Sequence, residues 1–228
     1  MSIPFRCAAL LSLALAASPL QARAQDRQPP AHRQVDRRST IPPAQQPADD
    51  GRAARVLRFL AGGTAGLVVH EAGHVLSGVA LGANPGFKRL DYGRIPFFVV
   101  THDPVSRRRE YVIASSGFLA QHAASEWLLG GPPLRPSPSS FRKGWLTFNL
   151  ATSAVYTAAA FGRFGPPERD TRGMAVSAGD DGVPEPWIGV LIVTPAALDT
   201  IRYAAGDPAW ARWSSRAAKA AMLLLAFR

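Results

Sequence analysis

Five apolar stretches follow one another along the chain after residue 52, separated by polar or proline-rich segments. They cover residues 56–83, 111–130, 145–161, 187–205 and 217–227. A helix needs roughly 20 mostly apolar residues to cross a bilayer. The pattern therefore predicts a mainly α-helical protein, built as a transmembrane bundle of about four spans. The last stretch is short for a full span, so it either crosses the membrane or lies on its surface.

A different pattern separates the first two apolar stretches. Residues 84–86, Asn-Pro-Gly, are a turn signal that ends the first helix. Residues 87–91 and 95–101 then have the composition of two short strands around a turn. We therefore expect a small β-hairpin between the first two core helices.

Two polar segments interrupt the later apolar stretches. Residues 132–140 are rich in Pro and Ser, and residues 162–186 contain Asp170, Asp180 and Asp181. These carboxylates could approach a functional site. A solvated loop is the simpler interpretation of both segments.

The first 51 residues differ in composition from the rest. Residues 1–24 have a basic start, a short apolar core and a small-x-small cleavage site ending at Ala24, which predicts a secretory signal peptide. An uncleaved anchor helix is the alternative. Residues 25–51 are rich in Pro, Gln and Arg without a hydrophobic period, and we expect them to be disordered. Residues 52–228 would then form the membrane-embedded domain.

The charge balance agrees with a membrane protein better than with a nucleic-acid binder. Hydrophobic residues make up 47% of the chain and charged residues 18%, yet the net charge is +10. No basic helix with interleaved aromatic residues is visible, which argues against nucleic acid as a partner. The bilayer is the partner that this composition favours.

Basic residues gather between the first two apolar stretches. They are Lys88, Arg89, Arg94, Arg107, Arg108 and Arg109. By the positive-inside rule this segment faces the cytoplasm. An exported N-terminal segment followed by one span predicts the same side. We therefore expect a multi-pass protein of a bacterial-type inner membrane with its N-terminal segment exported.

The first apolar stretch contains His70, Glu71 and His74 in the pattern H-E-x-x-H. On a helix, two histidines four residues apart project from one face and can share a zinc ion, while the glutamate can act as general base toward water. The alternative is a pair of ordinary helix histidines with an accidental spacing. The single cysteine, Cys7, excludes a cysteine-based zinc site, so any further ligand must be His or a carboxylate.

Small residues accompany the two histidines at intervals of four. Gly66, Gly78 and Gly82 share their face of the predicted helix. Small residues allow neighbouring membrane helices to approach closely. Ionisable residues at membrane depth usually face a protein interior or a water-filled site, which favours a functional role for the motif.

Three segments together resemble the site-2 protease family of intramembrane zinc metalloproteases. Residues 70–74 match that family's H-E-x-G-H. Residues 116–121, Ser-Gly-Phe-Leu-Ala-Gln, are similar to the segment that opens the family's next core helix. Residues 194–199, Thr-Pro-Ala-Ala-Leu-Asp, resemble the later segment whose aspartate is the third zinc ligand. The hairpin also has a counterpart in that family.

The resemblance implies a zinc metalloendopeptidase that cleaves membrane or membrane-proximal protein segments. Zinc would be held by His70, His74 and Asp199, with Glu71 as the catalytic residue. Reasoning from the residues alone also favours Asp199, because catalytic zinc takes three protein ligands and an acid in an apolar stretch needs a partner. His122, in the second apolar stretch, is the other candidate for the third ligand.

Departures from the family pattern motivate two alternatives. Phe118, Gln121 and Thr200 stand where that family has Pro, Asn and Gly. One alternative is therefore a non-proteolytic membrane protein that keeps the zinc-site scaffold for binding or assembly. The other, a soluble exported zinc peptidase, fits less well because four apolar stretches exceed what a domain of this size needs.

Overall fold

The computed structural model describes residues 51–92, 95–135, 139–179 and 182–227. In chain order the elements are α2 (Arg52–Ala80), β1 (Gly86–Tyr92), β2 (Ile95–Thr101), α3 (Arg107–Gly130), α4 (Ser140–Gly162), α5 (Asp170–Ala178), α6 (Glu185–Ala205) and α7 (Ala209–Phe227). These elements confirm the mainly α-helical fold and the hairpin between the first two core helices. The predicted signal peptide and, apart from Gly51, the predicted disordered segment lie outside the described residues.

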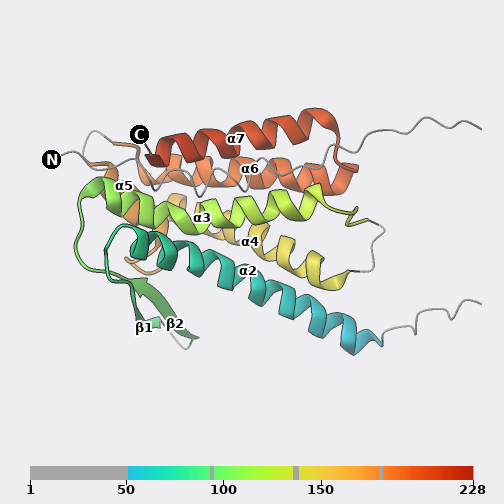
Figure 1. Ribbon diagram of the computed structural model, residues 1–228, viewed down its shortest axis with the longest axis horizontal. Coiled ribbons are helices and arrows are strands. Elements are labelled where there is room, and N and C mark those ends of the chain that lie inside the picture. Colours follow the sequence, from blue (N-terminus) through green and yellow to red (C-terminus); the bar gives the residue numbers. More distant parts are fainter. Residues whose placement is uncertain (1–50, 93–94, 136–138, 180–181, 228) are drawn as a thin grey trace, which may run out of the picture.

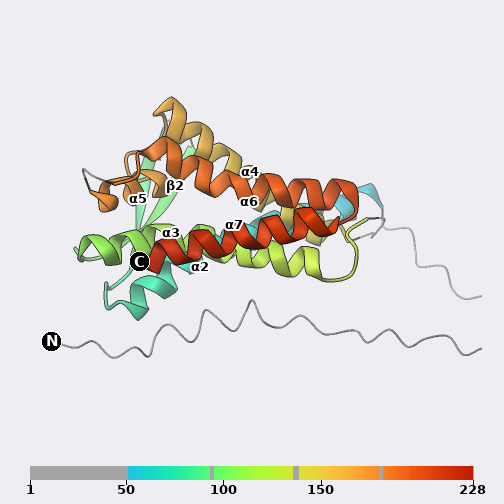
Figure 2. The same cartoon turned by 90° about the horizontal axis from the view of Figure 1, so that it is seen from above.

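The five long helices run side by side along the long axis of the molecule (Figure 1). Helix α2 packs against α3 and α4, α4 packs against α6, and α6 packs against α7. The short helix α5 packs mainly on α3. In both views α5 and the hairpin lie at the same end of the bundle, together with the end of α7 (Figures 1 and 2).

Glycine residues allow two of these helices to touch through their backbones. A Cβ atom on Gly62 of α2 would overlap the carbonyl of Phe141, and one on Gly144 of α4 would overlap the carbonyl of Phe59. Close crossing through small residues is typical of helices that pack in a membrane. The crossing holds α4 firmly against α2, which carries the histidines.

The inner face of α2 is small and polar, whereas its outer face is apolar. Its buried residues are Gly62, Gly66, His70, His74 and Gly78. Its most exposed large apolar residues are Leu57, Leu60, Val68, Leu76 and Val79. The predicted inward face is therefore confirmed from Gly66 to Gly78, while Gly82 lies beyond the helix in a turn with φ of 67°.

Exposed apolar side chains are also abundant on the other long helices. Trp127, Trp187, Trp210 and Leu224 are each more than half exposed. Among the described helices, α6 is long and apolar enough to cross a membrane by length and composition. Crossing by about four helices stays a prediction.

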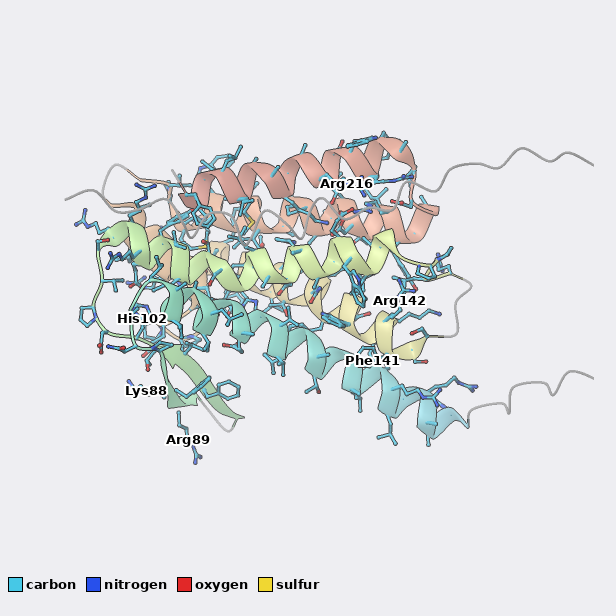
Figure 3. All side chains as sticks on the ribbon, in the orientation of Figure 1. Lys88, Arg89, His102, Phe141, Arg142 and Arg216 are labelled. Carbon is cyan, nitrogen blue, oxygen red and sulfur yellow. The ribbon has the colours of Figure 1, made fainter. Side chains whose placement is uncertain are left out.

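The hairpin pairs β1 with β2 in antiparallel register, from Gly86 opposite Thr101 to Tyr92 opposite Ile95. Its base is fixed to the end of α2 by two hydrogen bonds. The Asp103 N–H donates to the Ala83 carbonyl at 2.8 Å, and the Asn84 side-chain amide donates to the Asp103 carboxylate at 2.8 Å. The hairpin side chains Lys88 and Arg89 point away from the bundle, whereas Arg142 and Arg216 lie toward its opposite end (Figure 3).

Two helices differ from the prediction. The segment 162–186, expected to be a solvated loop, contains α5. This helix is held at its start because Arg169 and Thr171 both donate to the carboxylate of Glu185. Helix α7 begins at Ala209, well before the predicted apolar stretch 217–227.

The first turns of α7 carry two ion pairs. Arg212 pairs with Asp207 just before the helix at 2.9 Å, and Arg216 pairs with Glu126 of α3 at 2.8 Å. Both pairs stabilise these turns, which apolar periodicity alone does not reveal.

Two apolar clusters fill the interior. The larger one joins α3, α5, α6 and α7 through Phe118, Met174, Ile188, Ile192 and Met222. The smaller one, at the opposite end, consists of Leu128, Leu134 and Leu146. The larger cluster fixes α5 on the bundle, and α5 carries one of the residues of the site described next.

Candidate metal centre

The two histidines of the H-E-x-x-H motif lie side by side in the interior. His70 and His74 are 2% and 5% exposed. Their Nε2 atoms are 3.3 Å apart, and their rings meet edge to face with centroids 5.0 Å apart. The helical spacing of four thus places both rings on one face of α2, as predicted.

Hydrogen bonds at the far side of each ring fix its orientation. Nδ1 of His74 lies 2.8 Å from the carbonyl of Ile113, which can only accept, so this nitrogen carries the proton. Nδ1 of His70 lies 3.1 Å from Oε1 of Gln121.

The Gln121 amide is itself held in one orientation. Its Nε2 donates to the Asn149 carbonyl at 2.6 Å and to the Ser153 hydroxyl at 2.8 Å. Oε1 therefore faces His70 as an acceptor, and Nδ1 of His70 is the donor. When the histidines are neutral, both rings thus turn an unprotonated Nε2 toward the same point, an arrangement typical of metal-binding histidines.

The third residue at this point is Asp170, the first residue of α5. Its Oδ2 lies 3.1 Å from Nε2 of His70 and 3.4 Å from Nε2 of His74. The three side chains form a group that could hold a metal ion. Burial alone would raise the pKa of Asp170, but the adjacent His74 and His70 outweigh it and hold that pKa well below its usual range.

The backbone of α3 leaves room at the point where these atoms converge. A Cβ atom on Gly117 would overlap Nε2 of His74 and lie 2.8 Å from Nε2 of His70. Any other residue type at this position would fill the space between the ligand atoms. Gly73, inside the motif, allows α2 to approach α3 closely at the same level, because a Cβ atom on it would lie 2.5 Å from the Ser116 carbonyl.

Two unprotonated nitrogens and a carboxylate oxygen at these distances have no donor between them. In that protonation state the three lone pairs repel one another, and a cation placed among them removes the repulsion. The chemistry of the donor set therefore fits a metal ion, and the glycine at 117 supplies the space for it.

A cavity of about 410 Å³ lies next to this group. Glu71, His74 and Asp170 contribute to its wall, as do Tyr156 of α4 and residues 98–100 of β2. The ring of Tyr156 is centred 6.1 Å from that of His70. The glutamate of the motif thus shares a solvent-accessible space with the ligand atoms, as its predicted role as a base requires.

The predicted third ligand, Asp199, lies elsewhere. Its carboxylate accepts from Ser215 at 2.6 Å, Lys219 at 3.0 Å and Arg202 at 3.1 Å. His122, the other candidate, is buried and is not in the group of His70, His74 and Asp170. The structure therefore brings Asp170 to the two histidines in place of either predicted residue.

The sequence contained only a weak signal for Asp170. It begins a short helical stretch after Pro166 and Pro167, and an acid in the first turn of a helix is favourable without any ligand. Nothing local indicates that this turn folds back onto α2. The tertiary contact of α5 with α3 decides it.

Comparison of this chain with protein-family models, curated proteins and solved structures finds no match. The function of the chain is therefore inferred from the geometry of the site.

Proposed function

We propose that this chain is a membrane-embedded zinc endopeptidase that hydrolyses peptide bonds in membrane or membrane-proximal protein segments. One observation carries the proposal. Nε2 of His70, Nε2 of His74 and Oδ2 of Asp170 converge beside a cavity that Glu71 also lines. Two histidines with one carboxylate are a common ligand set of catalytic zinc, which keeps its fourth position for water or substrate.

The separations between the ligand atoms are compatible with a tetrahedral ion such as zinc. Zinc binds imidazole nitrogen and carboxylate oxygen at about 2.0–2.2 Å in tetrahedral geometry, which puts neighbouring ligand atoms about 3.3 Å apart. The separations in this site are 3.1, 3.3 and 3.4 Å. Gln121 and the Ile113 carbonyl hold the two rings in the orientation that such a site needs.

Zinc, when bound, supplies a Lewis acid that activates water and polarises the scissile carbonyl. Glu71 then has the proton-transfer role. It takes a proton from the attacking water and delivers it to the leaving amine. The carboxylate lies one residue along α2 from His70 and lines the same cavity, so both transfers occur in one enclosed space.

The hairpin provides a route for an extended peptide. Residues 98–100 of β2 form part of the cavity wall, and the described sheet has only two strands. A substrate segment can therefore pair with the free edge of β2 by strand addition, with its side chains in the apolar cavity. Strand addition binds the main chain of the substrate, so it suits a substrate helix that has been locally unwound.

The surface of the bundle supports a membrane setting. Helix α2 buries glycines and histidines and exposes leucines and valines, the reverse of a water-facing helix. Long helices with apolar outer faces and basic ends fit a bilayer. The hairpin and the metal group would then lie toward the cytoplasmic side.

The test compares the purified full chain with its Glu71→Gln variant in nonionic detergent micelles. A panel of single-span membrane proteins with unstructured juxtamembrane segments serves as substrate, and products are identified by mass spectrometry. We expect wild type to cleave members of the panel, the zinc chelator 1,10-phenanthroline to abolish cleavage, and Glu71→Gln to reduce it at least a hundredfold.

Zinc analysis of the same samples separates chemistry from folding. Glu71→Gln is expected to keep one zinc per chain, because Glu71 is not among the ligand atoms. Equal product formation by wild type and variant would contradict the proposal. It would instead favour a membrane protein that uses the zinc site for binding or assembly.

A further inference from the structure

A second cavity lies on the other side of α5 from the metal group. Its volume is about 500 Å³. Asp170 and Gly173 of α5 line the first cavity, whereas Arg172, Ala175 and Val176 line the second. The two cavities are thus separate, and the second has no place in the proposed peptidase chemistry.

Three arginines from three different elements line this second cavity. Arg107 begins α3, Arg163 directly follows α4, and Arg172 belongs to α5. Within the described part of the chain, none of their three guanidinium groups forms a hydrogen bond or an ion pair. Each is exposed to solvent. Among the described residues, the fold therefore gathers three arginines without an acidic partner around one space.

The acid in the described lining does not neutralise them. Glu185 accepts from Arg169 through two guanidinium nitrogens, at 2.7 and 2.9 Å, and from the Thr171 hydroxyl at 2.8 Å. Its charge is thus paired with Arg169, and both of its oxygens already accept hydrogen bonds. An anion entering the cavity would meet Arg107, Arg163 and Arg172 with little competition.

The arginine at position 163 caps the end of α4. Its φ is 53° and its ψ is 37°, a left-handed conformation that glycine and asparagine adopt at lower cost. A positive charge at a helix C-terminus is favourable in itself, and the same side chain also lines the cavity.

The rest of the lining is apolar, and apolar side chains continue onto the surface. Ala160, Pro184 and Pro186 line the cavity, and Val176 is 66% exposed. Trp187, next to Pro186, is 64% exposed. Arginines beside exposed tryptophan and aliphatic side chains are typical of the region where a membrane protein meets lipid headgroups.

We propose that this second cavity binds the phosphate headgroup of an acidic phospholipid. The three arginines hold the phosphate oxygens, since guanidinium groups match phosphate geometry through paired N–H donors. The acyl chains follow the exposed apolar side chains toward Trp187. This places the site at the cytoplasmic headgroup level in the orientation that the basic segment predicts.

The test uses the full chain in nonionic detergent micelles and native mass spectrometry, which counts bound lipid molecules. Dioctanoyl phosphatidylglycerol, dioctanoyl phosphatidylcholine and inorganic phosphate are titrated separately. We expect saturable binding of one phosphatidylglycerol and no comparable binding of phosphatidylcholine or of phosphate. Tighter or equal binding of inorganic phosphate would overturn the lipid assignment, and equal binding of both lipids would overturn the role of charge.

Matched variants distinguish lipid binding in this cavity from a nonspecific effect of the protein's positive charge. Arg107→Gln with Arg172→Gln removes two charges from the cavity, and Lys88→Gln with Arg109→Gln removes two from the same end of the molecule without touching it. A basic residue near an anionic headgroup contributes about fivefold, so the first pair should weaken phosphatidylglycerol binding roughly thirtyfold. The second pair should change it less than threefold.

Equal losses in the two pairs would overturn the proposal. Zinc content of the same samples provides the independent readout, because these four residues do not contact the metal group. Unchanged zinc with lost lipid binding supports the lipid site, whatever the outcome of the peptidase test. Unchanged lipid binding in the first pair, with the protein folded, overturns it.

Discussion

Two groups of buried polar side chains lie in the same helical bundle, and they differ in whether hydrogen-bond donors face their acceptor atoms. In the first, His70, His74 and Asp170 turn three acceptor atoms toward one another. In the second, Asp199 is surrounded by donors, with Lys219 Nζ 2.8 Å from its Oδ2 and the Ser215 hydroxyl 2.6 Å from its Oδ1. When its histidines are neutral the first group lacks a positive charge, whereas the second already contains Arg202 and Lys219.

The second group extends into a balanced ionic network. Arg202 bridges Asp199 and Glu126, and Lys219 pairs with the same two acids. The two acids and two bases cancel in charge, Arg216 adds a further pair with Glu126 at the surface side, and Asp207 adds an acid that pairs with Arg202. The network ties α3, α6 and α7 together, and it leaves no acid in need of a metal ion.

A buried acid therefore needs a partner, but the acid alone does not show whether that partner is a basic side chain or a metal ion. Asp199 and Asp170 both need one. Helix α7 brings Lys219 to Asp199, whereas α5 brings Asp170 to two histidines whose donor nitrogens face away. Of the two groups, only the one formed by His70, His74 and Asp170 can accept a metal ion.

The largest expected change is in zinc content, which should respond differently to substitution of the two aspartates. Asp170→Ala removes one of the three proposed ligands, so we expect stoichiometric zinc to be lost after purification and dialysis. Asp199→Asn, which keeps the shape of the side chain, is expected to retain one zinc per chain in the folded fraction. Metal analysis by plasma mass spectrometry measures both. Zinc retained in Asp170→Ala and lost in folded Asp199→Asn would restore Asp199 as the ligand.

The next effect tests the space between the ligand atoms. Gly117→Ala puts a methyl group against Nε2 of His74, so zinc affinity should fall by more than the 10–100-fold that is typical when only an outer partner of a metal ligand is lost. Gly130→Ala is the matched control, because it lies at the end of the same helix with no atom within 4 Å of the new Cβ. Competition with a chelating dye measures both affinities. Equal affinities in the two variants would mean that no metal sits at this point.

The smallest effect concerns stability and belongs to the second group. Asp199→Ala leaves Lys219 and Arg202 buried with one acid fewer, which should lower the free energy of unfolding by about 3–5 kcal/mol. Adding Lys219→Met should recover a large part of that loss, because the remaining charges balance again. Unfolding of the purified chain in mixed micelles measures this. Additive losses in the double variant would show that the two residues are not paired.

Much of the site's chemistry was predictable from local spacing, because helical periodicity fixes which residues share a face. The placement of His70 and His74 on the inner face of α2 with Gly66 and Gly78 follows from intervals of four. The hairpin followed from a turn signal between two short apolar runs. The interpretation of 162–186 as a loop was wrong in part, since α5 depends on tertiary contacts with α3 and on the Arg169–Glu185 pair.

The sequence by itself therefore determined the helices, the hairpin and the two histidines with their glutamate, because each depends on residues a few positions apart. Only the tertiary structure decided which acid joins them. Asp170 is 96 residues from His74 along the chain and Asp199 is 125, so local pattern cannot place either acid next to the histidines, although the apolar stretch around Asp199 had favoured it. Packing of α5 and α7 on the bundle decided it, by supplying Asp199 with Lys219 and the histidines with Asp170.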